Sequence, residues 1–342
     1  MNRVQTKTKS SILTKIAGYD NIGVVIALAV VLVLGLIFAP GMYNFRVIMQ
    51  LLKTNMLYGI VAVGVMFVLV SGGIDLSTGA IMSLSCNVIG YIQSFDPRAQ
   101  RIPTVVLILL SMAIGMVCGL FNGFLVGKMR IHPMLATLGT QYIFLAVSYH
   151  INYINLMSTQ LYKSVRGFAS ARFLGIYRGV WVLVIVYVIV GFILAKTKAG
   201  RKIYAIGSNE ASAYIAGINP GRVRMVAYTL CGICCGFAGF MFVSNFSYAY
   251  FDVSSDYAMK AICIAVLGGV SPAGGRGRID GMAISILVIS FINYFTTMIP
   301  SLGLYADAFY GLLVVVALCL NVITVRTRRH RELVKKEATL YD

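Results

Sequence analysis

The segment from Lys196 to Arg224 reads KTKAGRKIYAIGSNEASAYIAGINPGRVR and separates two long hydrophobic arrays. It is rich in Lys and Arg, and Glu210 is its only acid. Basic residues beside membrane spans mark the cytoplasmic side of a membrane. We therefore expect segment 196–224 to be a cytoplasmic connection between two groups of membrane-spanning helices.

A short helix is predicted inside this segment. Ser208 or Asn209 can cap it, Glu210 places an acid where the helix dipole favours negative charge, and Gly217 ends it before an Asn-Pro pair. Its small side chains would let a partner protein approach, and its larger apolar side chains would anchor that partner. An ordinary interhelical loop with a short surface helix fits the same residues. The small residues are Ala211, Ala213 and Ala216, and the apolar anchors are Tyr214, Ile215 and Ile218.

The composition indicates an all-α polytopic membrane protein. Of the 342 residues, 59% are hydrophobic and only 12% are charged. A soluble core cannot bury that much apolar surface, whereas a set of membrane spans can. The formal net charge of +18 could suggest nucleic acid as a partner. We expect instead that the charge is sorted to one side of a lipid membrane, with no nucleic-acid partner.

About ten membrane spans are predicted from the hydrophobic runs. They cover residues 21–39, 57–70, 78–92, 104–126, 134–151, 180–195, 225–246, 258–270, 279–299 and 306–325. Segment 42–55 is expected to be a short interfacial helix. Ten spans put both termini on one side, and most of the 29 Lys and Arg residues then face the cytoplasm. The expected organisation is a basic cytoplasmic N-terminus (residues 1–20), one transmembrane domain (residues 21–325) and a basic cytoplasmic tail (residues 326–342).

Two of these spans are short and are associated with paired glycines. Span 57–70 runs into Gly72-Gly73 and then Asp75, and span 258–270 contains Gly268-Gly269. Both are shorter than the ~20 residues needed to cross the hydrocarbon, so we expect broken helices inside protein or along a wet cavity. Asp75 is expected either to cap the next helix or to line a transport path, and the two roles are compatible.

The two glycine pairs belong to an internal repeat. The pattern Val70-x-Gly72-Gly73-Ile74-x-x-x-x-Gly79 recurs as Val266-x-Gly268-Gly269-Val270-x-x-x-x-Gly275. Repeated broken helices in corresponding positions point to the path of a transporter. Paired glycines also simply allow helices to pack closely, so the repeat alone leaves both interpretations open.

The remaining polar residues of the spans predict no metal site and no catalytic site. Asn122 lies within a span, where a hydrogen bond to another helix is its simplest role. His132 has no Cys or acid nearby at ligand spacing, and Cys231, Cys234 and Cys235 lack the second pair that would complete a zinc site. The spans also contain no Ser/His or paired-Asp constellation, which argues against an intramembrane enzyme.

Four motifs occur in a fixed order along nearly the whole chain. They are VSGGIDLSTG (residues 70–79), GLFNG (residues 119–123) with Leu138-Gly139-Thr140 soon after, YAIGSNEASAYIAGIN (residues 204–219) and GGVSPAGGRGRIDG (residues 268–281). Together they resemble the permease family of bacterial ABC importers for ribose, galactose, xylose and related sugars, including autoinducer-2.

The resemblance implies the type II importer arrangement in the bacterial inner membrane. A permease homodimer or heterodimer would bind two cytoplasmic ABC ATPase subunits and, outside, a periplasmic or lipid-anchored sugar-binding protein. The chain has no G-x-x-x-x-G-K-[ST] motif, so we expect it to bind no cofactor and to be no enzyme, with ATP and Mg on the partner ATPase.

The resemblance also implies roles for individual residues. The segment around Ser208 to Gly217 would be the coupling helix that contacts the ATPase. The expected coupling residues are Ser208, Asn209, Glu210, Ala211, Ala213, Tyr214 and Gly217. The expected residues of the translocation path are Gly72, Gly73, Asp75, Asn122, Lys260, Gly268 and Gly269.

Lys260 departs from the family pattern. Family members commonly carry an acidic sequence close to Glu-Leu-Asp-Ala-Ile-Ala before the second glycine pair, whereas this chain has Lys260 there. Lys260 can extend toward the membrane surface or pair with Asp256, one helical turn earlier. If it lines the path instead, it would disfavour cationic solutes and suit an anionic or phosphorylated one.

The expected function is that of the permease subunit of an ATP-driven, binding-protein-dependent importer for a monosaccharide or related small polyol. A nucleoside-importing permease of the same superfamily is an alternative, which would differ in its receptor rather than in any residue of this chain. A secondary transporter that uses Asp75 as its coupling acid is a further alternative, although a helix-cap position suits that role poorly.

Overall fold

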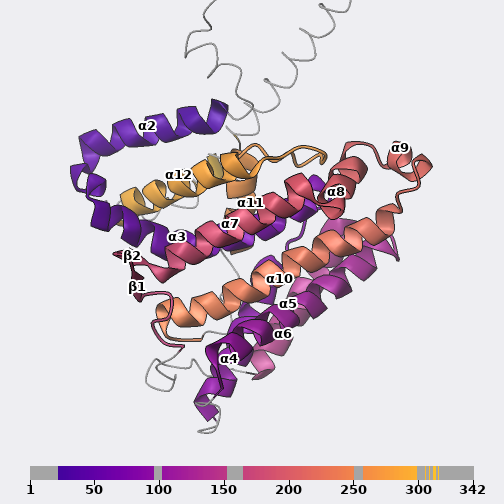
Figure 1. Cartoon of the computed structure of the whole chain (residues 1–342), viewed down its shortest axis with the longest axis horizontal. Coiled ribbons are helices and arrows are strands. Elements are labelled where there is room, and N and C mark those ends of the chain that lie inside the picture. Colours follow the sequence, from indigo (N-terminus) through magenta and orange to yellow (C-terminus); the bar gives the residue numbers. More distant parts are fainter. Residues whose placement is uncertain are drawn as a thin grey trace, which may run out of the picture.

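The computed structural model describes residues 22–95, 102–151, 165–249 and 257–298, together with residues 305, 308, 311, 312 and 315. Nearly all of this part of the chain is helical (Figure 1). The elements are α2 (Ile22–Phe38), the 3-10 helix η1 (Pro40–Tyr43), α3 (Phe45–Val70), α4 (Thr78–Phe95), α5 (Thr104–Gly127), α6 (Pro133–Ile151), β1 (Arg172–Phe173), β2 (Ile176–Tyr177), α7 (Arg178–Lys196), α8 (Lys198–Ser208), α9 (Glu210–Ile215), α10 (Pro220–Phe246), α11 (Tyr257–Leu267) and α12 (Ile279–Met298).

Helix α3 forms the centre of the bundle. Between Met56 and Val70 almost every side chain of α3 is buried. Helices α7, α10, α11 and α12 contact α3, while α2 packs on α12 and the group of α4, α5 and α6 packs around α10. In Figure 1, α2 and α12 lie above α3, and α4, α5, α6 and α10 lie below it.

The helices have the length and composition of membrane spans, as the sequence predicts. Within the described residues, α3, α5, α7, α10 and α12 are each long and apolar enough to cross a membrane, and α2 and α11 are shorter apolar helices. Helices α5 and α7 expose many large apolar side chains, as lipid-facing helices do. The all-α polytopic membrane fold is therefore confirmed. Segments 1–20 and 326–342, and most of the tenth predicted span, lie outside the described residues.

The second predicted span is longer than the sequence analysis expected. The prediction of a separate interfacial helix over residues 42–55 is wrong, because η1 is followed by one continuous helix, α3, of 26 residues. At 1.5 Å per residue α3 is about 39 Å long, which is enough to cross the ~30 Å hydrocarbon layer. Lys53 suggested an interface, but its ammonium lies 5.1 Å from the centre of the Tyr177 ring, an arrangement that accommodates the charge within a helix.

Helices α5 and α10 pack against each other through glycines. Gly115, Gly119, Gly123 and Gly127 recur at every fourth position of α5. A methyl group on Gly119 would overlap the carbonyl oxygen of Tyr228 and would lie 3.0 Å from the Cα of Gly232. The two backbones therefore touch directly, which is the close packing that small residues permit between membrane helices.

Candidate coupling surface and transport path

The polar connection between the two hydrophobic arrays folds into two helices, α8 and α9. Helix α8 is amphipathic and was not expected as a separate helix. The side chain of Thr197 caps it by accepting a hydrogen bond from the Gly200 amide, and Ile203 and Ile206 are buried. The two helices lie at one end of α7, and the β1–β2 hairpin lies at the other end (Figure 1).

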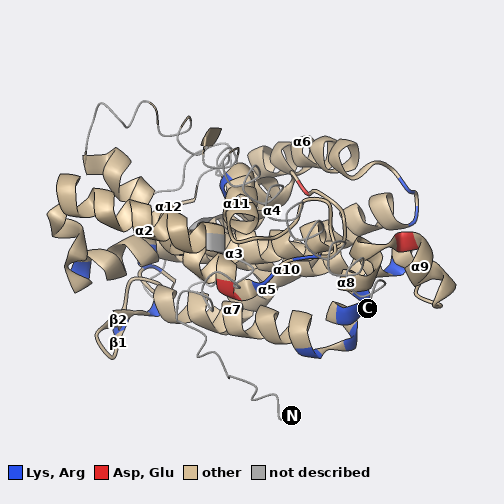
Figure 2. Cartoon of the chain, turned by 90° about the horizontal axis from the view of Figure 1, so that it is seen from above, with Lys and Arg blue, Asp and Glu red and all other residues tan. Residues whose placement is uncertain are grey.

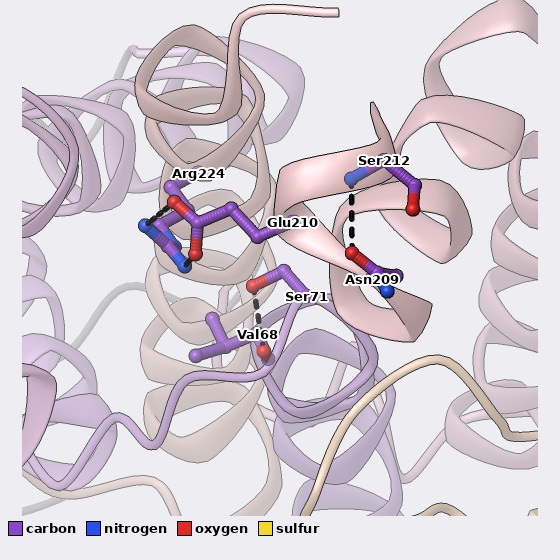
Figure 3. Close-up of polar contacts among 6 residues, drawn as sticks. All are labelled: Val68, Ser71, Asn209, Glu210, Ser212 and Arg224. Atoms are coloured by element: carbon purple, nitrogen blue, oxygen red, sulfur yellow. Dashed lines mark hydrogen bonds and ion pairs between the residues drawn. The ribbon is translucent and has the colours of Figure 1, made fainter. Parts of the chain in front are cut away.

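Helix α9 is the short helix that the sequence predicts. Asn209 is its cap, because the Asn209 Oδ1 atom accepts a hydrogen bond of 2.9 Å from the Ser212 amide (Figure 3). Ser208 instead forms the last residue of α8. Gly217 has a φ of +80°, and the amides of Gly217 and Ile218 donate to the carbonyls of Tyr214 and Ala213, respectively. These bonds are the Schellman motif that ends a helix at glycine.

The side chains of α9 divide into an inner and an outer face. Ala213 is only 5% exposed, so its small side chain lets α9 lie close to the rest of the chain rather than to a partner. By contrast, Tyr214 is 68% exposed and Ile215 is 86% exposed. Ala211 and Gly217 are exposed as well. The outer face of α9 thus presents two large apolar side chains on a polar segment.

An ion pair joins α9 to the start of α10. The guanidinium of Arg224 donates to both carboxylate oxygens of Glu210, with 3.0 Å between Nη1 and Oε1 (Figure 3). The side chains are partly exposed, so the pair contributes at most about 1 kcal/mol to stability. Its two-point geometry nevertheless fixes the orientation of α9 relative to α10. Several Lys and Arg positions lie on the ribbon near α8 and α9 (Figure 2).

The two glycine pairs of the internal repeat lie in the same kind of turn, shifted by one residue: the left-handed residue is the first glycine of the first pair and the second glycine of the second pair. Gly72 has a φ of +82° and Gly269 a φ of +86°. The Gly72 and Gly73 amides donate to the carbonyls of Leu69 and Val68, and the Gly269 and Val270 amides repeat these bonds at the end of α11. Both α3 and α11 therefore end in a Schellman motif, and the helix breaks lie where the sequence predicts them.

Asp75 and Asn122 meet in a buried polar cluster between these breaks and α5. The Asp75 Oδ1 atom accepts hydrogen bonds from the amide (2.9 Å) and the hydroxyl (2.7 Å) of Ser77. The Asn122 side-chain amide donates to the same Ser77 hydroxyl over 2.7 Å. The Oδ2 atom of Asp75 and the Oδ1 atom of Asn122 are buried and have no hydrogen-bond partner among the described residues. Asp75 thus organises the backbone just before α4, and Asn122 ties that backbone to α5.

Lys260 lies on α11 among aromatic rings. Its ammonium is 5.5 Å from the centre of the Tyr58 ring, and Tyr58 stacks on Tyr257 with 4.4 Å between ring centres. Such a contact stabilises a cation at an apolar depth. The predicted pairing partner, Asp256, lies outside the described residues. Lys260 therefore lies beside the middle of α3, where Tyr58 is located, whereas Asp75 follows the end of α3.

Some polar contacts of this region were not anticipated. The Tyr204 hydroxyl of α8 donates to the Gly277 carbonyl over 2.6 Å, and the side chains of Asn55 and Asn293 hydrogen-bond between α3 and α12. Burial raises the pKa of the Tyr204 hydroxyl, which therefore stays protonated and able to donate at neutral pH. Tyr204 could have been identified from the sequence as a polar residue on the buried face of an amphipathic helix.

Metal ligation finds no support in the described residues. No group of three or more His, Cys, Asp and Glu side chains in them could hold a metal ion. Cys231 and Cys235 are buried within α10.

Comparison with known proteins gives a consistent family. The family described as "Branched-chain amino acid transport system / permease component" matches residues 47–318. The ribose import permease protein RbsC of Bacillus subtilis strain 168 is 33% identical over 307 residues, which cover 88% of this chain and 92% of the relative. RbsC of Escherichia coli K12 is 31% identical over 271 residues (78% and 83%).

A third relative carries a different solute in its name. The autoinducer 2 import system permease protein LsrD of Photorhabdus temperata is 29% identical over 317 residues, covering 89% of this chain and 93% of the relative. No solved structure matches the chain. The family match spans most of the chain, and we conclude that the protein belongs to this family of ABC importer permeases, together with the ribose and autoinducer-2 import permeases.

Proposed function

We propose that this chain is the permease subunit of an ATP-driven, binding-protein-dependent importer and forms the path for a monosaccharide or related small polyol. The family match over residues 47–318 carries the proposal. The relatives named for ribose and autoinducer-2 favour a small, polyhydroxylated solute over the branched-chain amino acids of the family's description. Permeases of this family work with separate ATPase subunits, so ATP and Mg would bind there and not to this chain.

The outer face of α9 is the proposed docking site for the ATPase. Tyr214 and Ile215 are highly exposed although they lie outside the membrane spans, where exposed large apolar side chains are costly without a partner. Glu210, Arg224 and the cap at Asn209 hold this face in a fixed orientation. A fixed helix presenting apolar anchors is the arrangement that fits into a groove of another protein.

The arrangement outside the chain is also part of the proposal. Two copies of the chain, or this chain and a related one, would enclose the path, with both termini in the cytoplasm. A periplasmic or lipid-anchored sugar-binding protein would deliver the solute to the opposite end from α9. The path would use the glycine-ended helices α3 and α11, with Gly72, Gly73, Gly268 and Gly269 at their ends. Asp75 and Asn122 would line it close to the end of α3, and Lys260 would line it from the first turn of α11.

Solute uptake by the native host tests the transport role. Cells that lack the chain are compared with cells that carry it on a plasmid, using radiolabelled ribose, galactose, xylose and adenosine, and autoinducer-2 depletion from the medium. We expect loss of uptake of one sugar or of autoinducer-2, restored by the plasmid. Loss of adenosine uptake alone would favour the nucleoside-importing permease. Unchanged uptake of all sugars, of autoinducer-2 and of adenosine would contradict the proposal.

A further inference from the structure

The last turn of α8 packs between the end of α3 and the loop that connects α11 to α12. Gly207 lies at the contact, and a methyl group on it would overlap the Val70 carbonyl oxygen and lie 2.6 Å from the Gly275 amide nitrogen. Val70 is the last residue of α3, and Gly275 belongs to the loop that follows α11. Three segments that are far apart in the sequence therefore meet at Gly207.

Backbone atoms make this contact on all sides. The Gly275 amide donates to the Val70 carbonyl over 2.9 Å, which joins the two loops of the internal repeat directly. A methyl group on Gly274, whose φ is +87°, would lie 2.8 Å from the Gly207 carbonyl oxygen and 3.0 Å from the Cα of Gly72. Side chains can change rotamer to absorb a displacement, but backbone atoms in contact cannot.

A side-chain hydrogen bond strengthens the same junction. The Tyr204 hydroxyl, one helical turn before Ser208, donates to the Gly277 carbonyl over 2.6 Å. Two contacts therefore hold α8 to the loop after α11: the hydrogen bond of Tyr204 and the backbone contact of Gly207. We call this contact of Tyr204 and Gly207 with Val70, Gly274, Gly275 and Gly277 the three-segment junction.

The junction lies directly beside the proposed docking helix. Only Asn209 separates α8 from α9, and its amide donates to the Ala205 carbonyl while its side chain caps α9. A displacement of α9 therefore carries the last turn of α8 with it. That turn touches the end of α3 and the loop between α11 and α12, so a displacement of the turn acts on both segments together.

We propose that Gly207 is a positioning residue that transmits movement of α9 simultaneously to the end of α3 and to the loop between α11 and α12. This inference rests on the proposed docking of the ATPase on α9. It assigns the internal repeat a mechanical role: the two glycine-ended helices respond as one pair because their loops share one contact with α8. A bulkier residue at position 207 separates the loops from α8 and leaves the docking face itself intact.

Hydrogen exchange of the permease in nanodiscs tests the inference. The full-length chain is measured by mass spectrometry with and without the ABC ATPase subunit of its native host and Mg-ATP. In the native chain we expect ATPase binding to protect residues 208–217 and to change exchange in residues 71–77 and 268–278 by about tenfold. In Gly207→Ala, we expect binding and protection of 208–217 to remain, and the change in both loops to be lost.

Two further variants keep the outcome interpretable. Gly139→Ala is the matched control, because nothing lies within 4 Å of the added methyl group, and it should behave as the native chain. Tyr204→Phe provides the test if Gly207→Ala does not fold. It removes one hydrogen bond without adding bulk, and it should weaken the response of residues 268–278 more than that of residues 71–77. If ATPase binding protects residues 208–217 of the native chain but changes exchange in neither loop, the inference is overturned and the proposed function stands. Absence of ATPase binding to the native chain would instead overturn the proposed function.

Discussion

The Ser77 hydroxyl connects the loop before α4 to α5. It donates to Asp75 Oδ1 and accepts from the Asn122 side-chain amide, each over 2.7 Å, and all three side chains are fully buried. Inside protein, a hydrogen bond contributes little when made but costs much when one partner is left without it. Asp75 and Asn122 therefore both depend on Ser77 for a hydrogen-bond partner.

We predict that Ser77→Ala lowers the stability of the permease by about 1–3 kcal/mol, because a buried amide donor loses its acceptor. Thermal unfolding of the detergent-purified chain measures the effect. Ser285→Ala is the matched control: its buried hydroxyl donates only to the Gly281 carbonyl of its own helix, so its midpoint should fall much less. Equal midpoints for the two variants would show that the cluster does not need Ser77.

The sequence identified Asp75 and Asn122 because polar side chains in apolar spans require partners. It did not identify Ser77, since serine is common in both loops and membrane helices and carries no comparable signal. The sequence also could not predict which face of α9 is buried. A helix of six residues is too short for its apolar positions to define a face, so Ala213 was expected outside and is buried.

Helix α9 offers a direct test of docking. We predict that Ile215→Asp weakens binding of the ABC ATPase by about tenfold or more, corresponding to ~1.4 kcal/mol, because a charge replaces an apolar anchor at a contact that excludes water. Ile215 is so exposed in the chain alone that the change should leave folding intact. Co-purification of the detergent-solubilised permease with its ATPase, titrated by ATPase concentration, measures the affinity.

Leu174→Asp is the control for this experiment. Leu174 is an exposed apolar residue between β1 and β2, at the other end of α7. The same chemical change there should leave ATPase binding at the native level. If Ile215→Asp binds the ATPase as tightly as Leu174→Asp does, α9 does not dock through its apolar face.

The helices themselves were predictable where hydrophobic runs are long and uninterrupted, as in α5, α7 and α12. The start of α3 was not, because Arg46 and Lys53 resemble interfacial residues, whereas Lys53 in fact lies over the ring of Tyr177 in the distant strand β2. Helix α8 escaped prediction for a related reason. Its two glycines lower helix propensity, and both are required by backbone contacts that only the folded chain reveals: Gly200 packs on Leu194 and Gly207 on Val70.

The two ends of the molecule differ in their contacts with polar segments. One end carries α8, α9 and the loop between α11 and α12. The Tyr204–Gly277 hydrogen bond joins this loop to α8, and the Gly275–Val70 hydrogen bond joins it to the end of α3. The other carries η1 and the β1–β2 hairpin. Basic residues concentrate at the first end, although the second has its own, such as Arg172 and Arg178 (Figure 2). The proposed orientation places α9 in the cytoplasm and the hairpin outside.

Cysteines introduced into the β1–β2 hairpin and into α9 test this orientation. In a Cys319→Ser background, we predict that a membrane-impermeant maleimide labels Leu174→Cys in intact spheroplasts and labels Ile215→Cys only in inside-out vesicles. Both positions are highly exposed, and the native cysteines in the described part of the chain are buried or half-buried, so background labelling should be low. The reverse pattern would place α9 on the periplasmic side, where no cytoplasmic ATPase can reach it. It would contradict both the inside-positive charge argument and the coupling role of α9.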